Sequence, residues 1–266
     1  MLKIGLTYTG NQEKHNYYVN WLVSKNDREF EKEAGSFPAP HTIEVIKLSV
    51  SDHHLKRIQD CDGLVLAGGR DIHPKFYSNV NTDYPYSNGF DEQRDEFEIE
   101  MFKKAQENEI PVLGVCRGLQ LINCILMGNL NQDIGEGSNK IHRAEESVVV
   151  KQMSDKAHPL NIEAGSLIHN IALFKRAVVN SAHHQSINRL GEGLTGNCLS
   201  DEGIIEGIEW IDRKGKSFLL GVQWHPERMF QLNLQDSPLS KGIRDLLIDE
   251  INKSILKKSG IKTNTL

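Results

Sequence analysis

The sequence lacks the features that mark several classes of protein. It has only four cysteines and no C-x-x-C pair, so neither a disulfide framework nor a zinc knuckle is expected. No apolar run approaches the ~20 residues that a membrane-spanning helix needs. Basic residues number 31 against 36 acidic ones, with a net charge of −5, which argues against nucleic-acid binding. We therefore expect a cytoplasmic protein with free thiols that binds neither nucleic acid nor membranes.

The composition is that of an ordinary globular chain. Hydrophobic residues make up 38% of the sequence and charged residues 25%, close to the average of globular domains. Residues 1–7 have the pattern of a first buried strand, and no signal-peptide cleavage pattern follows them. Without a repeat or a low-complexity linker, the chain is expected to form one domain over residues 1–258, with a frayed tail over residues 259–266.

Strand-like and helix-like stretches alternate in the first half of the chain. This alternation predicts an α/β fold with a mostly parallel central sheet and helices on both faces. Ligands of such a sheet bind at the carboxyl ends of its strands. The expected strands cover residues 2–9, 42–48, 63–67 and 110–115, and the expected helices cover residues 13–33, 52–59, 91–109 and 119–127.

The second half of the chain has a different pattern, with short strand candidates separated by turns. It predicts a smaller antiparallel β element in the C-terminal half. Residues 212–216 resemble a hairpin loop, and residues 239–257 carry apolar side chains at helical spacing. The expected strands are residues 147–153, 177–180, 204–211 and 218–222.

Cys116 stands between two glycines, after an apolar run and before a helical pattern. This arrangement is typical of a nucleophile elbow, a sharp turn that presents one side chain. A helix N-terminus and a nearby imidazolium both lower the pKa of a thiol. The alternative is a buried structural cysteine, which we expect for the three that lack flanking glycines, namely Cys61, Cys124 and Cys198.

His225 and Glu227 follow another apolar run, two residues apart. The histidine could accept the proton of a thiol and pass it to a leaving amine, and the glutamate could orient the imidazole. A tetrahedral intermediate also needs two N–H donors for its oxyanion. Gly68 and Gly69, at the end of an apparent strand, and the amide of Arg117 are the candidates. The alternative in each case is an ordinary surface turn.

Residues 180–185 place many polar groups directly after a predicted strand. Two adjacent histidines could ligate a metal, but neighbours on a strand point to opposite faces and no carboxylate has a matching spacing. We therefore expect no metal and no cofactor, and substrate binding instead. The candidate substrate-binding residues are Gln120, Ser181, His183, His184 and Gln185. His142-Arg143 is a further candidate, and the alternative is that these two residues are an ordinary pair on the surface.

Taken together, these segments resemble the class I glutamine amidotransferase superfamily, and within it the γ-glutamyl-γ-aminobutyrate hydrolase-like family (peptidase family C26). The resemblance runs from about Ile4 to Glu227. It rests on the motifs at residues 67–74, 94–95, 111–123, 142–143, 179–185, 201–206 and 221–227, in this order.

The resemblance implies a flavodoxin-like fold, a Cys116–His225–Glu227 triad, and an oxyanion hole at the 68–69 loop and the Arg117 amide. Synthase-coupled amidotransferases usually carry leucine where Arg117 stands, and often lack His-His-Gln, so both features favour the hydrolase branch. Residues 78–88 lack the family's usual short acidic sequence, which leaves the leaving-group specificity open.

We expect hydrolysis of small γ-glutamyl amides, such as γ-glutamyl-γ-aminobutyrate, through a thioester on Cys116. One alternative is a glutaminase component that delivers ammonia to a synthase partner. Another is a non-catalytic binding or regulatory protein on the same fold, although such proteins normally lose the nucleophile or base. The amine, the pathway and the oligomeric state, a homodimer included, stay open.

Overall fold

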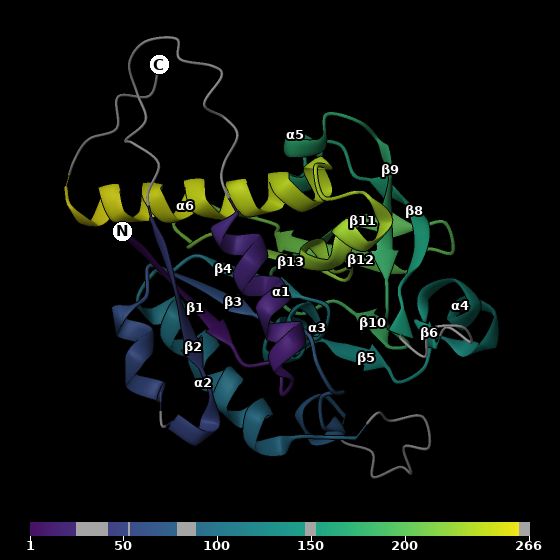
Figure 1. The fold of residues 1–266 in the computed structure, drawn as a ribbon, viewed down its shortest axis with the longest axis horizontal. Coiled ribbons are helices and arrows are strands. Elements are labelled where there is room, and N and C mark those ends of the chain that lie inside the picture. The colour runs from purple at the N-terminus through teal and green to yellow at the C-terminus, as the bar shows by residue number, and fades with distance from the viewer. Residues whose placement is uncertain (25–41, 53, 79–88, 147–152, 261–266) are drawn as a thin grey trace.

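The computed structural model describes residues 1–24, 42–52, 54–78, 89–146 and 153–260, and these build a nine-stranded sheet (Figure 1). Five neighbouring strands run parallel and confirm the predicted α/β fold. The antiparallel strands of the C-terminal half do not form a separate element but extend the same sheet. The order is β2 (Ile43–Leu48), β1 (Leu2–Thr7), β3 (Gly63–Leu66), β4 (Val112–Val115), β13 (Leu219–Val222), β12 (Ile205–Trp210), β11 (Leu194–Ser200), β8 (Lys156–Ile162) and β9 (Arg176–Ser181).

Helices cover both faces of the sheet because successive strand residues point to opposite sides. Val65 packs into one core layer and its neighbour Leu64 into the other. The first layer lies under α1 (Gln12–Val23), α5 (Leu167–Ala172) and α6 (Ile243–Lys258), and Figure 1 shows α6 lying across this face. The second lies under α2 (Glu92–Glu107) and α3 (Arg117–Ile125).

Shorter elements complete the C-terminal half and connect it to the sheet. Helix α4 (Gly135–His142) precedes the two-stranded pair of β6 (Glu145–Glu146) and β7 (Met153–Ser154). A second pair joins β5 (Asn129–Asn131) to β10 (Ser186–Arg189). The sequence patterns missed β8, β11, α4 and α5. Strand β8 contains Pro159, which normally argues against a strand, but here the proline lies outside the stretch that pairs with β11.

Several expectations fall partly outside the described residues. The helix expected over residues 13–33 is described as α1, which ends at Val23. Residues 25–41, most of the 78–88 loop, residues 147–152 and the tail from 261 onward are not described.

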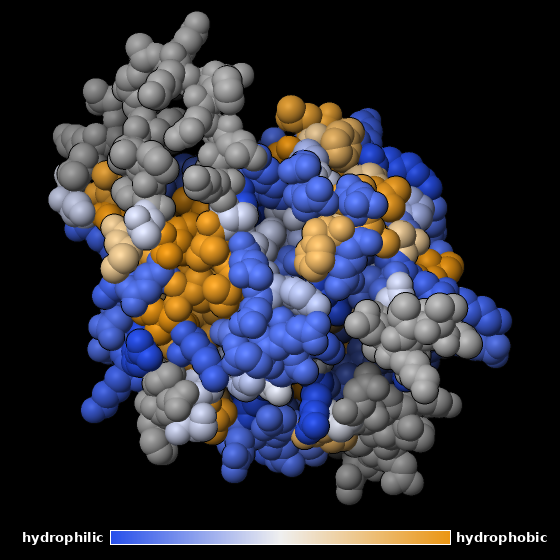
Figure 2. Space-filling view, in the orientation of Figure 1, coloured by the Kyte–Doolittle hydropathy of each residue, from blue (hydrophilic) through white to orange (hydrophobic). Residues whose placement is uncertain are grey.

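No helix in the described ranges is long and apolar enough to cross a membrane. Figure 2 shows an apolar surface over the end of the sheet formed by β1 and β2.

The topology brings three sequence motifs together. Strand β4 lies between β3 and β13, and all three run parallel. Gly68 follows β3, Cys116 follows β4 and His225 follows β13. The three residues therefore meet at the carboxyl edge of the sheet, as the sequence predicts.

Candidate active site

Cys116 adopts a strained backbone conformation between β4 and α3. Its φ of 52° and ψ of −104° are rare for a residue with a side chain, and its N–H donates to the carbonyl of Val222, 2.7 Å away. Gly118 allows the turn to pack closely, because a Cβ there would lie 2.1 Å from the carbonyl oxygen of Leu66. The cysteine thus stands at the N-terminus of α3 on a turn that its surroundings fix.

His225 and Glu227 form the pair that the sequence predicts. His225 Nδ1 lies 2.8 Å from Glu227 Oε1, and both residues are buried. Pro226 starts a short 3₁₀ turn that brings the two side chains to the same side. A Cβ on Gly68 would lie 2.8 Å from His225 Cε1 and 3.7 Å from Cys116 Cβ, so all three groups face one small space.

The charges around Cys116 and His225 favour a thiolate beside an imidazolium. Burial raises the pKa of the Cys116 thiol, but the charge of His225 and a hydrogen bond to it outweigh burial and hold the pKa below its ordinary value. Burial and Arg228 lower the pKa of His225, whereas Glu227 and Cys116 raise it, with a net result of about 9. Each charged group therefore favours the charged form of the other.

Gln223 is a further group at the thiol that the sequence analysis did not single out. Its Nε2 donates to Cys116 Sγ at 3.4 Å, while its Oε1 accepts from Gln120 Nε2 at 3.1 Å. Gln120 also donates to the carbonyl of Gln185. Gln120 thus orients Gln223 toward the sulfur. Its position in the stretch from Gly221 to Glu227, just before the histidine, is the signal that could have identified Gln223.

The glycine loop after β3 is held by two side chains. The Gly68 N–H donates to the hydroxyl of Tyr18 at 3.0 Å. Arg94 Nη2 donates to the carbonyl of Gly68, also at 3.0 Å. The N–H of Gly68 therefore already has an acceptor. The Arg117 amide, at the first position of α3, has no acceptor within its own helix.

The side chain of Arg117 points into a buried ion network and not toward substrate. It pairs with Asp95 and Glu98, and Arg94 Nε donates to Glu98 at 2.8 Å. Arg117 is 2% exposed and both carboxylates are fully buried. Its function in the structure is to join α3 to α2.

The five predicted substrate-binding side chains all have protein partners. Ser181 Oγ lies 3.3 Å from His142 Nδ1. His184 Nε2 lies 3.1 Å from Asp71 Oδ2, and the side chain of Gln185 donates to the carbonyl of Gln132. Of the five, Gln120 reaches the thiol through Gln223, and His183 acts on it electrostatically.

The model of the family described as Peptidase C26 matches residues 4–227. The chain belongs to the peptidase C26 family. A relative in Rickettsia prowazekii, named as a glutamine amidotransferase-like protein, is 34% identical over 203 residues, which cover 62% of this chain and 70% of that protein.

Two further proteins place this peptidase C26 member among its relatives. The γ-glutamyl-γ-aminobutyrate hydrolase PuuD of Escherichia coli is 31% identical over 171 residues, covering 62% of this chain and 64% of that protein. The solved glutaminase domain of CTPS from Trypanosoma brucei, with bound acivicin, has a TM-score of 0.59 at 16% identity and covers 95% of this chain and 94% of that chain. The latter likeness shows the fold.

Beside the Cys116 site, the C26 fold brings together a cluster that the sequence patterns missed. His142, His158, His183 and Glu206 are all buried, and one ligand atom from each lies within 4.8 Å of the others. The surface pair considered for His142-Arg143 is therefore wrong for His142. The four residues are far apart in the sequence, so no spacing pattern reveals them.

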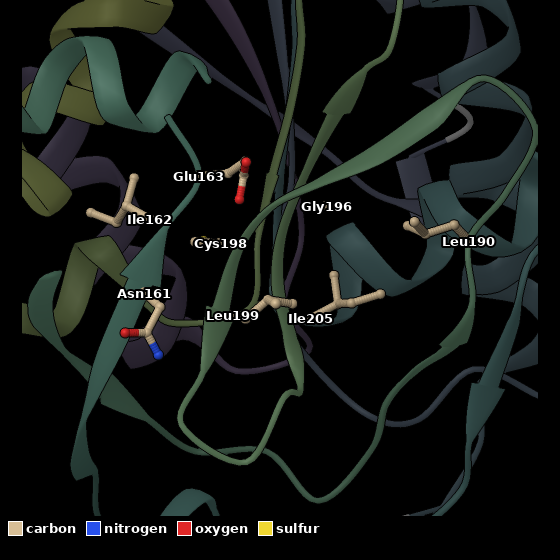
Figure 3. Close-up of a pocket in the computed structure, with 8 residues that line it drawn as sticks. All are labelled: Asn161, Ile162, Glu163, Leu190, Gly196, Cys198, Leu199 and Ile205. Carbon is tan, nitrogen blue, oxygen red and sulfur yellow. The ribbon is translucent and has the colours of Figure 1, made fainter. Parts of the chain in front are cut away.

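A separate pocket of about 290 Å³ lies on the antiparallel part of the sheet (Figure 3). It is lined from β8, β11 and β12 by residues that include Ile162, Leu199 and Ile205. It contains none of the three residues of the Cys116 site, so it is not a candidate for the same chemistry.

Proposed function

We propose that this peptidase C26 member is a cysteine hydrolase that cleaves the γ-glutamyl amide bond of small compounds such as γ-glutamyl-γ-aminobutyrate. The observation that carries the proposal is the Cys116 thiol beside His225, whose Nδ1 lies 2.8 Å from Glu227 Oε1. These three groups supply a nucleophile, an acid–base catalyst and an orienting carboxylate.

The first step is attack of the Cys116 thiolate on the γ-carbonyl carbon. The developing oxyanion is bound by the Arg117 N–H and the Gly69 N–H, since the Gly68 N–H already donates to Tyr18. His225 Nε2 then protonates the amine nitrogen as the C–N bond breaks. A γ-glutamyl thioester remains on Cys116.

The second step hydrolyses the thioester. Neutral His225 accepts a proton from water, the resulting hydroxide attacks the thioester carbon, and the C–S bond breaks. Glutamate leaves, and the thiolate–imidazolium pair is restored. Each proton moves through His225, so the reaction needs no metal or cofactor.

We propose that the glutamyl group is recognised more strictly than the amine. Its α-carboxylate and α-ammonium need matched partners when they are buried. Because the side chains of Gln120, Ser181, His183, His184 and Gln185 are held by protein partners, we propose that they shape this pocket. The name of the E. coli relative supports γ-glutamyl-γ-aminobutyrate as the first substrate to test.

The test is a screen of γ-glutamyl amides, glutamine included, with the purified protein alone, monitoring glutamate and ammonia. We expect γ-glutamyl-γ-aminobutyrate or a related amide to be cleaved faster than glutamine, and Cys116→Ala to cleave none. No cleavage of any γ-glutamyl amide would reject the proposal.

The second candidate is the glutaminase component of an amidotransferase. The amidotransferase-like name of the Rickettsia relative favours it. It predicts that only glutamine is cleaved, and only after a synthase is added.

A further inference from the structure

Four buried side chains converge from four elements on one point beside the active site. His142 ends α4, His158 lies in β8, His183 follows β9, and Glu206 lies in β12. Glu206 Oε1 lies 3.4 Å from His183 Nε2, 3.6 Å from His142 Nδ1 and 3.8 Å from His158 Nε2. Ligand atoms around a tetrahedral zinc ion, at about 2.0–2.1 Å from the metal, are separated by comparable distances.

The second nitrogen of each histidine lies close to an oxygen atom outside this point. His183 Nδ1 lies 2.9 Å from the carbonyl of Gln185, and His158 Nδ1 lies 3.0 Å from the carbonyl of Pro159. His142 Nε2 lies 3.4 Å from Glu202 Oε2. Because carbonyl and carboxylate oxygens accept, these nitrogens carry the protons. The other nitrogens then present lone pairs to the cluster, as zinc-binding histidines do.

Most of the atoms that face the cluster lack hydrogen-bond partners among the described residues. His158 Nε2, His183 Nε2 and both carboxylate oxygens of Glu206 are buried without one among the described residues. His142 Nδ1 lies 3.3 Å from the Ser181 hydroxyl. Buried polar atoms without partners are costly. A proton on one histidine would balance the charge of Glu206 but leave the other atoms unpaired, whereas a divalent cation satisfies them together.

We propose that His142, His158, His183 and Glu206 bind a zinc ion. Imidazole nitrogens and carboxylate oxygens are both zinc ligands, and four protein ligands complete the tetrahedral shell of the ion. The sequence neighbours His183 and His184 do not face this cluster together. The structure uses His183 alone, since His184 lies against Asp71.

The ion is structural and not part of the hydrolytic step. Four protein ligands in a buried site leave no position for water or substrate. The ion joins α4, β8, β12 and the turn after β9. The carbonyl of Glu206 also accepts from the N–H of Gln223, whose side chain donates to Cys116. Zinc bound to Glu206 would therefore hold Gln223 in position beside Cys116.

The experiment measures metal content and thermal unfolding of the full chain. Wild type is stripped with a chelator, dialysed, and titrated with Zn²⁺, and with Co²⁺ as a spectroscopic probe. We expect one zinc per chain, a cobalt spectrum typical of tetrahedral coordination, and a higher Tm with zinc. After the same dialysis, Glu206→Gln and His158→Gln should each retain less than a tenth as much zinc as wild type.

Two control variants separate this site from the hydrolase proposal. His15→Gln, which alters a buried histidine elsewhere in the protein, should bind zinc as wild type does. Cys116→Ala should keep the zinc and lose activity. The proposal is overturned if folded wild type binds neither zinc nor cobalt, or if His158→Gln still holds one equivalent. Because wild type is decisive by itself, a variant that does not fold leaves the test intact.

Discussion

Arg94 and Arg117 bind opposite oxygens of one buried carboxylate: Arg94 Nε donates to Glu98 Oε1, and Arg117 Nη1 donates to Glu98 Oε2. Arg94 also donates to the carbonyl of Gly68, and Arg117 follows Cys116 in the chain. The glycine loop and the nucleophile turn are therefore fixed to α2 through the same side chain.

Replacing that carboxylate should lower both stability and activity. We expect Glu98→Gln to reduce the free energy of unfolding by about 3–5 kcal/mol, because it leaves buried guanidinium charge without its partner. Urea unfolding and kcat would be measured. Glu100→Gln is the matched control on the same helix, since its ion pair with Lys103 is exposed and exposed pairs contribute about 0–1 kcal/mol. Equal stability of the two variants would contradict the role of Glu98.

Sequence patterns predict the parallel half of this fold well. Each apolar run before a glycine motif is a buried parallel strand, and strands of that kind have a continuous apolar pattern. The antiparallel half was harder to predict. β8 contains His158 and Pro159, and β11 contains Gly196 and Asn197, so neither has a clear alternation of polar and apolar residues.

The site shows the same division. Cys116, His225 and Glu227 lie within short local motifs, and their arrangement follows from the order of three parallel strands. The contacts of Tyr18 and Gln223, and the four-residue cluster around Glu206, join residues distant in the sequence. Such contacts depend on tertiary packing and leave no spacing in a single sequence.

Only Cys116 should be essential among the four cysteines. Burial raises the pKa of the Cys61 thiol to about 12 and also raises the pKa values of Cys124 and Cys198, whereas the pKa of Cys116 is lowered. Iodoacetamide at neutral pH should therefore label Cys116 first, as peptide mapping would reveal. Cys116→Ala should be inactive, and Cys61→Ser should keep most of its activity. An active Cys116→Ala protein would refute the thioester mechanism.

The pH profile of kcat/KM should fall as the pH rises through about 9. Despite burial, the pKa of His225 is raised from 6.5 to about 9, so the imidazolium that protonates the leaving amine is lost as pH rises through that value. By the same sign, the contribution of this group to folding stability is complete below pH 6.5 and is lost through about pH 9. Glu227→Gln removes one cause of the raised pKa, so the falling limb should move to lower pH. If the falling limb of Glu227→Gln stays at the wild-type pH, Glu227 does not raise the pKa of His225.

His225 and Glu227 should act with Cys116 as a unit. We expect His225→Ala to lower kcat by about 10⁴-fold or more, and Glu227→Gln to lower it less, because Glu227 orients the base without moving the proton. The double variant should be no slower than His225→Ala alone, as expected for residues that act together. Steady-state kinetics of the three variants would measure this. Additive losses would mean that Glu227 acts elsewhere.

The hydroxyl of Tyr18 should matter for turnover although it does not take part in the chemistry. It accepts the N–H of Gly68 at 3.0 Å and so fixes the loop from which the next amide, that of Gly69, is proposed to bind the oxyanion. Tyr18→Phe leaves a buried N–H without an acceptor, which costs about 1–3 kcal/mol. We expect kcat to fall on the order of tenfold, less than the ~10²-fold loss for an oxyanion donor itself, with little change in KM.

The neighbouring tyrosine provides the control for this prediction. Tyr17→Phe makes the same chemical change on the same helix, but the Tyr17 hydroxyl donates to Glu13 near the surface. That variant should keep the wild-type kcat. If the two tyrosine variants turn over at the same rate, the Tyr18–Gly68 hydrogen bond does not position the oxyanion loop. A fall in kcat confined to Tyr18→Phe, with unchanged KM, would show that the hydroxyl helps the loop to stabilise the transition state. Binding of the substrate in its ground state would be unaffected.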